Sequence, residues 1–233
     1  MEIVARSPSG LSFGFTGRGD GDALDYSNLA NAVTRLTGRE WSGPVARLKQ
    51  VHSDVVETVG PETAASVEPG FLLLGQGDAI TSSRRGPAAA VFVADCAPIA
   101  LYDRVMGLGA VVHAGWRGMA AGIALRTVER LRLAGCESLE AVVAPHAGPC
   151  CYEFGAADAI ELERRLGMEI TSRTTSGEVS IDIFAALSAQ LLGAGVDLAA
   201  GRPECTICSG KYFSYRAGDA VARQALILLP SRP

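Results

Sequence analysis

Short apolar runs along the chain indicate that much of it forms buried β-strands. Each run has the length of a strand, is rich in alanine and branched aliphatic residues, and is bounded by polar or turn-forming residues. The first two runs are separated by Cys96-Ala97-Pro98, which interrupts the apolar pattern. The predicted strands cover residues 88–95, 99–103, 108–113, 141–144 and 221–229.

Three segments instead show the apolar spacing that is typical of amphipathic helices, at residues 119–133, 156–166 and 183–192. Gly135 stands after the first as a helix stop, and Asp182 stands before the third as an N-cap. Residues 42–77 contain several Gly-Pro and Pro-Gly turns and are expected to be rich in loops. Because strands and helices do not alternate regularly, the sequence predicts a mixed α/β (α+β) class and leaves the sheet order open.

The composition is that of a globular domain. Hydrophobic residues make up 48% and charged residues 20% of the 233 residues, which is enough apolar surface for a large core. We expect a single domain over residues 1–233. The formal net charge is −4 and no block of lysine or arginine occurs, which argues against binding to nucleic acid or to an anionic membrane.

The start of the chain does not resemble an export signal, and the apolar runs are too short to cross a bilayer. We therefore expect a cytoplasmic protein whose six cysteines are reduced thiols. The sequence leaves the oligomeric state open.

Three residues of metal-binding types stand where predicted strands end or begin. Cys96 follows a buried strand, His113 ends another, and His52 precedes a short alternating run. Side chains at strand ends are held by a sheet yet face open space. Imidazole and thiolate bind zinc and copper well, and three protein ligands leave a fourth position for water or substrate. The sequence therefore predicts a catalytic metal site at His52, Cys96 and His113.

Two other interpretations of these residues stay open. Each could be an ordinary, partly buried structural residue, because their separations match no local metal motif. Alternatively, Cys96 could be a nucleophile activated by His113 or His52, with Asp95 or Asp78 orienting the imidazole base.

The remaining cysteines are not expected to form the main site. Cys205 and Cys208 have CxxC spacing, but no second pair completes a zinc ribbon. Cys150 and Cys151 are adjacent and poorly placed to close a four-ligand cage by themselves. Cys136 follows a predicted helix and is expected to be inert.

Two arginines are candidates for binding an anionic substrate, because a guanidinium binds phosphate and carboxylate through two parallel hydrogen bonds. Arg18 lies in the glycine-rich segment 14–20, which lacks the Gly-Lys-Ser/Thr of a P-loop. Arg216 ends the aromatic cluster 212–215, and aromatic rings beside an arginine suit stacking on a base or sugar.

Several motifs spread over nearly the whole chain occur in the order of one protein family. They are Lys49-Gln50-Val51-His52, Gly77-Asp78-Ala79-Ile80-Thr81, Ala94-Asp95-Cys96-Ala97-Pro98, His113-Ala114-Gly115-Trp116-Arg117-Gly118, Gly148-Pro149-Cys150-Cys151-Tyr152-Glu153 and Tyr212-Phe213-Ser214-Tyr215-Arg216. The chain thereby resembles the YfiH-like family, also described as laccase-domain or polyphenol-oxidoreductase-like proteins.

This resemblance implies a single-domain, four-layer α/β/β/α sandwich with mixed sheets. It also implies a zinc ion, with copper as the less favoured metal, held by the same three residues that the strand ends single out. The residues that we expect to contact substrate are Arg18, Asn28, Gln50 and Arg216.

The function implied by the resemblance is that of a zinc-dependent purine nucleoside phosphorylase. Its substrates would be phosphate and adenosine, inosine or methylthioadenosine, with adenosine deamination as a second activity. An amidase-type hydrolase that edits UDP-MurNAc amino-acid precursors of the cell wall is the main alternative. A copper-dependent polyphenol oxidase is disfavoured, since three histidines cannot supply several copper centres. A non-catalytic binding protein is the alternative outside enzymes.

Overall fold

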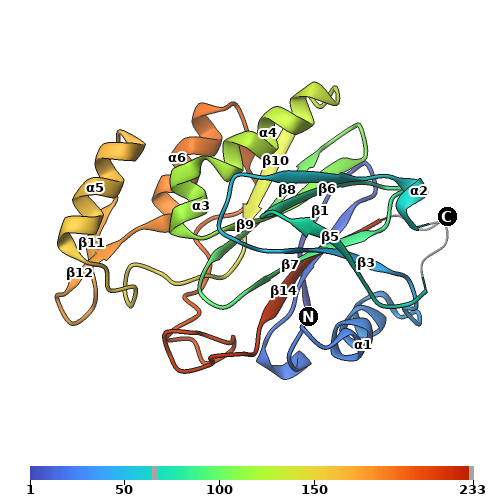
Figure 1. The fold of residues 1–233 in the computed structure, drawn as a ribbon, viewed down its shortest axis with the longest axis horizontal. Helices are drawn as coiled ribbons and strands as arrows, with labels where there is room; N and C mark the ends of the chain where they lie inside the picture. Colours follow the sequence, from blue (N-terminus) through green and yellow to red (C-terminus); the bar gives the residue numbers. More distant parts are fainter. Residues whose placement is uncertain (65–67, 231–233) are drawn as a thin grey trace.

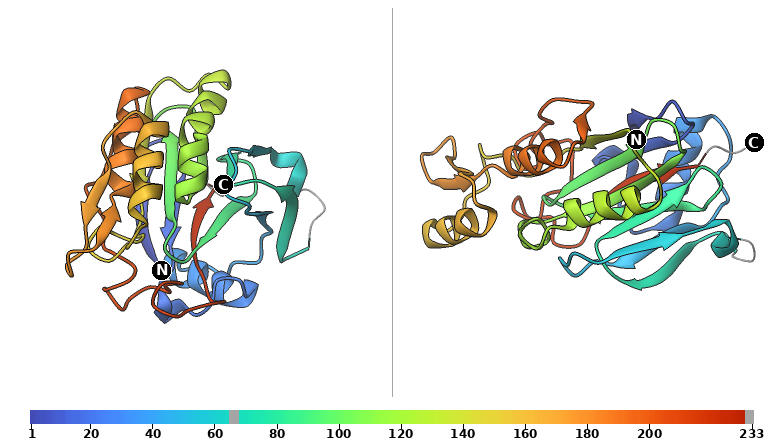
Figure 2. Two further views of the ribbon diagram at one scale, coloured as in Figure 1. Left: turned by 60° about the vertical axis from the view of Figure 1, so that its left-hand side comes forward. Right: turned by 90° about the horizontal axis from the view of Figure 1, so that it is seen from above.

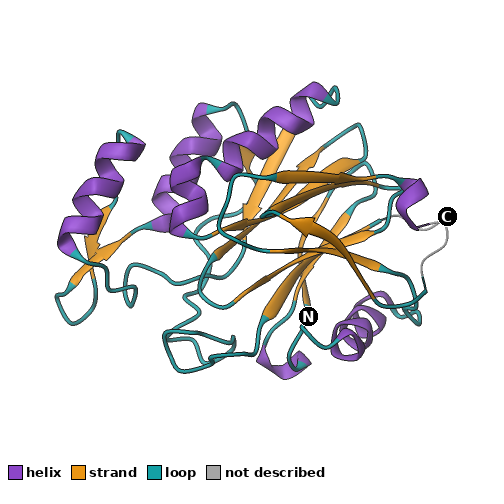
Figure 3. Cartoon of the chain, viewed as in Figure 1, coloured by secondary structure: helices purple, strands orange, loops and turns teal. Residues whose placement is uncertain are grey.

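Two six-stranded β-sheets pack face to face, and helices cover their outer faces (Figures 1 and 3). This arrangement is taken from a computed structural model that describes residues 1–64 and 68–230. The mixed α/β class and the four-layer α/β/β/α order expected for the chain are thereby confirmed.

The first sheet has the order β1-β2-β14-β7-β3-β5. Strand β14 pairs antiparallel with β2 and β7, whereas β3 runs parallel to β7 and β5. The sheet is therefore mixed, and β3 and β7 lead into the connections that carry His52 and Cys96. Its strands are β1 (Glu2–Arg6), β2 (Ser12–Phe15), β3 (Val45–Lys49), β5 (Phe71–Gln76), β7 (Ala88–Val93) and β14 (Gln224–Leu229).

The second sheet has the order β13-β10-β8-β9-β6-β4. Strands β8 and β9 are antiparallel, with Ala97 opposite Ala114 and Pro98 opposite His113. This register places the residue before β8, Cys96, beside the end of β9. The strands are β4 (Val56–Val59), β6 (Ala79–Ser83), β8 (Ala97–Asp103), β9 (Leu108–Ala114), β10 (Leu139–Val143) and β13 (Asp197–Leu198).

Helices lie on both outer faces of the sandwich (Figure 2). The α1 helix (Tyr26–Thr37) packs on the first sheet, and α3 (Trp116–Ala121), α4 (Ile123–Leu133) and α6 (Ile183–Gly193) pack on the second. Helix α5 (Ala156–Leu166) and the hairpin of β11 (Thr171–Arg173) and β12 (Val179–Ile181) project beyond the sheets. A short α2 (Pro61–Ala64) and the 3₁₀ turn η1 (Arg18–Asp20) complete the described elements. None of the described helices combines the length and apolarity needed to span a membrane.

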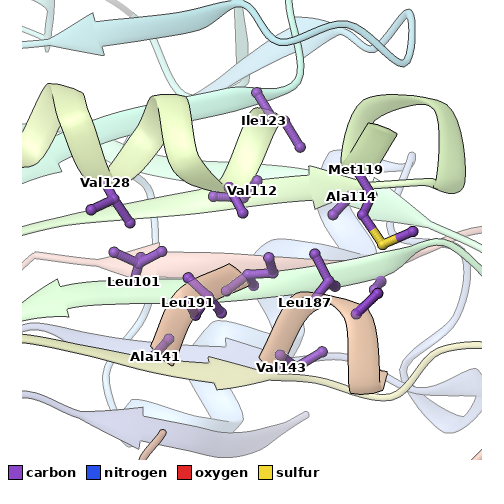
Figure 4. Close-up of a cluster of buried hydrophobic side chains, with 14 of the residues drawn as sticks. Leu101, Val112, Ala114, Met119, Ile123, Val128, Ala141, Val143, Leu187 and Leu191 are labelled. Carbon is purple, nitrogen blue, oxygen red and sulfur yellow. The ribbon is translucent and has the colours of Figure 1, made fainter. Parts of the chain in front are cut away.

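The buried core forms three layers that correspond to this architecture. Phe13, Phe15 and Val111 lie between the two sheets, and each is at most 1% exposed. A second cluster lies between the second sheet and α3, α4 and α6, where Leu187 and Leu191 of α6 face Ala141 and Val143 of β10 (Figure 4). The third lies under α1. Because the central strands β7, β8, β9 and β14 are buried on both faces, they show the continuous apolar runs seen in the sequence.

Most predicted strands and helices are confirmed, and the differences have local causes. The helix predicted at residues 119–133 is broken at Gly122, whose φ of 88° ends α3 and begins α4. Helix α1 was missed, although Asp25 caps its start by accepting from the Ser27 N–H and Gly38 ends it with a φ of 69°. The segment 42–77, expected to be rich in loops, contains β3, β4 and β5; its residues 65–67 lie outside the described part.

The packing between the sheets predicts that Phe13→Ala destabilises the protein strongly. Truncating a fully buried phenylalanine removes its transfer free energy and leaves a cavity, which costs about 3–5 kcal/mol. Urea unfolding followed by circular dichroism should show a lower midpoint with little change in slope. Leu133→Ala is the matched control, because Leu133 is 81% exposed. Equal midpoints for the two variants would contradict this view of the core.

Candidate metal centre

His52, Cys96 and His113 converge at one end of the two sheets. His52 follows β3 of the first sheet, Cys96 lies in the connection from β7 to β8, and His113 is near the end of β9. One ligand atom from each of the three lies within 4.8 Å of those of the other two. The site therefore lies where the chain passes from strands of the first sheet to strands of the second.

The spacing of these side chains fits a single tetrahedral ion. His52 Nε2 lies 3.7 Å from Cys96 Sγ, and tetrahedral zinc with ordinary bond lengths would separate such atoms by about 3.6 Å. Gly115 keeps the space between them clear. A Cβ on Gly115 would lie 2.7 Å from His52 Cδ2 and 2.9 Å from Cys96 Sγ. The chemistry of the donors and the clearance at Gly115 both fit a bound metal.

Backbone strain is concentrated at this site. His52 has a φ of 61° and Asp95 a φ of 91°, and they are the two non-glycine residues with positive φ in the described chain. Such a conformation costs of order 1–3 kcal/mol and persists only where surrounding contacts impose it. At His52 the contact is with Asp78, whose Oδ1 accepts the His52 N–H at 3.0 Å.

Asp78 is the centre of the hydrogen-bond network beneath the site. Its carboxylate, which is fully buried, accepts from the Val51, His52 and Ser53 backbone N–H groups, from the Ser53 hydroxyl and from His113 Nδ1 at 2.7 Å. Burial alone would raise the pKa of this carboxyl, but these hydrogen bonds and the His113 ring lower it well below its usual range. Because Nδ1 of His113 is engaged, Nε2 is the nitrogen left to face a metal.

The charges of the site favour a thiolate. Burial alone would raise the pKa of the Cys96 thiol, but hydrogen bonds and electrostatic attraction from His113 and His52 lower it to about 6. Burial alone would lower the pKa of His113, but hydrogen bonds to Asp78 and Cys96 raise it to about 9. A thiolate is the form of cysteine that binds a metal or attacks an electrophile.

The two aspartates considered as partners for an imidazole have different roles. Asp78 contacts His113, as described above. Asp95 instead accepts from the Thr206 hydroxyl at 2.6 Å, the Ser214 hydroxyl at 3.0 Å and the Arg216 N–H at 2.8 Å. Asp95 thus fastens the loop that carries Arg216 to the connection that carries Cys96.

The three metal-type residues open into a cavity of about 580 Å³. A larger hollow of about 1030 Å³ lies between β4, β6 and α4, but no histidine or cysteine is among the described residues that line it. The wall of the smaller cavity is basic and aromatic. Its lining includes Arg47, Lys49, Arg117, Arg216 and Arg223, the single acidic residue Asp95, and the rings of Phe92, Trp116, Tyr152 and Tyr215.

The four residues expected to contact substrate are not all brought to this cavity. Arg216 and Gln50 line it, although the Gln50 amide is occupied by the Phe92 backbone, with bonds of 2.7 and 2.8 Å. Arg18 and Asn28 are not among the lining residues. Arg18 forms an ion pair with Asp219 at 2.6 Å, and the Asn28 amide donates to the Asp22 carbonyl at 3.1 Å.

Three lining arginines were not singled out from the sequence. Among the described residues, none of Arg47, Arg117, Arg216 and Arg223 forms an ion pair with a carboxylate. Arg47 is held between the rings of Phe71 and Phe92, and its buried Nε has no hydrogen-bond partner in the described chain. The sequence did contain a signal for Arg117, since it stands four residues after His113, where the chain leaves β9 and begins α3.

Two similar proteins carry the name purine nucleoside phosphorylase. A purine nucleoside phosphorylase of Corynebacterium glutamicum is 35% identical over 191 residues, covering 80% of this chain and 74% of that protein. A purine nucleoside phosphorylase of Streptomyces coelicolor is 31% identical over 229 residues, covering 93% of this chain and 94% of the relative.

Solved structures share the fold. The crystal structure of the hypothetical protein YfiH of Bacillus licheniformis matches with a TM-score of 0.78 and 23% identity, covering 94% of this chain and 92% of that one. YlmD of Geobacillus stearothermophilus matches with a TM-score of 0.74 and 24% identity, covering 96% and 91%. Residues 11–229 match the family model described as multi-copper polyphenol oxidoreductase laccase. With this match and the two named relatives, the chain belongs to the laccase-like, YfiH family.

Proposed function

We propose that this protein is a zinc-dependent purine nucleoside phosphorylase. The observation that carries the proposal is that the cavity is lined mainly by basic residues although the chain as a whole is acidic. The chain has a net charge of −4, yet five basic side chains and one acidic one surround the His52, Cys96 and His113 trio. A basic cavity in an acidic protein selects an anionic substrate, and the relatives' names supply phosphate as that anion.

Arg47 is the residue to which we assign phosphate binding. Its guanidinium is positioned by two aromatic rings and by burial, and no carboxylate neutralises it in the described chain. A guanidinium with free donors binds phosphate oxygens with charge-assisted hydrogen bonds. In phosphorolysis the bound phosphate attacks C1′ of the ribose as the bond to the purine breaks, so the arginine would orient the nucleophile.

The aromatic residues of the wall suit a purine and its sugar. Trp116, Tyr152 and Tyr215 line the cavity, and the Arg216 guanidinium lies 4.6 Å from the centre of the Tyr152 ring. Aromatic faces and arginine planes stack on nucleobases irrespective of their identity. This is consistent with a site that accepts adenosine, inosine and methylthioadenosine.

His52, Cys96 and His113 would hold the zinc ion, which would act as a Lewis acid in the reaction. Asp78 orients His113 toward it and keeps the proton of that ring on Nδ1. The Cys96 thiolate contributes one negative charge to the donor set, which suits a divalent cation. Deamination of adenosine belongs to the same proposal, because it would use the same purine-binding wall.

A second candidate function is an amidase-type hydrolase, including one that edits cell-wall precursors. The hydrogen bond between His113 and Asp78 and the lowered pKa of Cys96 are the features of an activated cysteine nucleophile. The family's copper-oxidase description is not what we propose, because the three histidines of the chain cannot supply several copper centres.

The metal assignment predicts the effect of removing a ligand. Purified Cys96→Ser or His113→Ala protein should contain about one zinc ion fewer per chain than the wild type, because two ligands no longer retain the ion tightly. Metal analysis by mass spectrometry checks this, and circular dichroism checks that the fold survives. Unchanged zinc content in both variants would remove these residues from the metal site.

The reaction predicts a requirement for phosphate. With inosine or adenosine, the protein should release free base together with ribose 1-phosphate when phosphate is present, and no base without it, because phosphate is the nucleophile. Chromatography of the products distinguishes the outcomes. Base released equally fast without phosphate would make the enzyme a hydrolase, and cleavage of a cell-wall amide in place of nucleosides would favour the second candidate.

The cavity geometry predicts which arginine matters for phosphate. Arg47→Met should raise the KM for phosphate about tenfold to hundredfold, because a lost charged hydrogen bond costs about 1.5–3 kcal/mol. Arg18→Met is the matched control and should leave this KM nearly unchanged, since Arg18 is paired with Asp219 outside the cavity. The reverse result would restore the assignment of Arg18 made from the sequence.

A further inference from the structure

The remaining cysteines form a second cluster that no step of the proposed reaction uses. The sequence suggested that Cys205 and Cys208 lack a partner pair, and the structure shows that this is wrong. Cys150 and Cys151, in the loop after β10, meet Cys205 and Cys208, in the loop before Tyr212. All four Sγ atoms lie within 4.8 Å of one another.

The sulfur separations match those around a single tetrahedral ion. Zinc binds cysteine sulfur at about 2.3 Å, which places two ligands of a tetrahedron about 3.8 Å apart. Cys150 Sγ lies 3.9 Å from Cys208 Sγ and 3.6 Å from Cys151 Sγ. A disulfide would require sulfurs about 2.05 Å apart, and all four cysteines are free thiols.

Backbone hydrogen bonds hold together the two loops that carry these cysteines. Gly148 N–H donates to Cys205 Sγ at 3.2 Å, and N–H donors to ligand atoms are a typical outer layer of a metal site. A Cβ on Gly148 would lie 3.2 Å from Cys205 Cβ and 3.4 Å from Cys150 Sγ. The two loops also pair directly, because the Thr206 N–H donates to the His146 carbonyl at 3.0 Å.

Burial differs among the four cysteines in a way that suits metal loading. Cys150, Cys151 and Cys205 are partly buried, whereas Cys208 is exposed. Three of the thiols are therefore partly shielded from solvent, and the exposed fourth thiol offers a path by which an ion would enter. A four-thiolate tetrahedron with every position filled is the arrangement of structural zinc rather than catalytic zinc.

We propose that Cys150, Cys151, Cys205 and Cys208 bind a second, structural zinc ion that is separate from the centre at His52, Cys96 and His113. The ion would tie together two loops that form one wall of the cavity. Tyr152 directly follows Cys151, and Arg216 lies shortly after Cys208; the Arg216 guanidinium stacks on the Tyr152 ring and donates to the Glu153 carbonyl at 2.9 Å.

Zinc stoichiometry in the reduced, full-length protein tests this proposal. The wild type, purified without chelators, should contain about two zinc ions per chain, one filled four-thiolate site and one three-ligand site. Cys205→Ser with Cys208→Ser should lower the content to about one, and adding Cys96→Ser to that pair should lower it to nearly none. Cys136→Ala is the matched control, because it removes a buried thiol outside both clusters, and should leave the content unchanged.

Cobalt substitution gives a readout that does not depend on enzyme activity. Cobalt-loaded wild-type protein should show strong thiolate charge-transfer absorption that the Cys205→Ser, Cys208→Ser variant largely loses, while the weaker band from Cys96 remains. The variant should also melt at a lower temperature than the Cys136→Ala control. A single zinc ion in the wild type that only Cys96→Ser removes would overturn the proposal. So would an intact mass two hydrogens lower under non-reducing purification, which indicates a disulfide, or iron in place of zinc.

Discussion

The buried carboxylate of Asp78 is the interaction on which the candidate site depends. It accepts hydrogen bonds from the segment Val51–Ser53, which follows the first sheet, and from His113 in the second sheet. One buried charge thus joins the two sheets where the metal-type residues meet, and hydrogen bonds from three backbone N–H groups, one hydroxyl and one imidazole compensate its burial. The left-handed backbone of His52 and the orientation of the His113 ring are both consequences of this single group.

The sequence predicts the local features of this fold well and the long-range ones poorly. Apolar runs reveal the buried strands because both faces of each sheet are covered. Cys96 and His113 are noticeable because they are the residues at which apolar strands give way to residues of metal-binding types. That His52 joins them depends on how β3 and β9, in different sheets, are aligned. No periodicity encodes that alignment, so the cluster of His52, Cys96 and His113 could be suspected from chemistry but not placed.

The same reason explains two groups of side chains whose partners the sequence did not indicate. Arg18 lies in a glycine-rich loop of the kind that can bind an anion. In the structure its charge is balanced by Asp219, which lies 201 residues further along the chain. The CxxC pair lacks neighbours in the sequence because its partners precede it by more than fifty residues. Whether a charge is balanced, and how many cysteines meet, depends on the folded structure and cannot be deduced from the spacing of residues in the sequence.

The position of β14 has a consequence for how the protein reaches this structure. Leu226 in that strand pairs with Phe15 on one side and Val91 on the other, so the middle of the first sheet joins segments from opposite ends of the sequence. Sheets with such distant pairings fold slowly, because the entropy cost of closing a long loop comes before any stabilising hydrogen bond forms. Until β14 arrives, β2 and β7 expose unpaired apolar edges. A partly folded chain that lacks the β14 pairings would therefore be more prone to aggregation than the native protein.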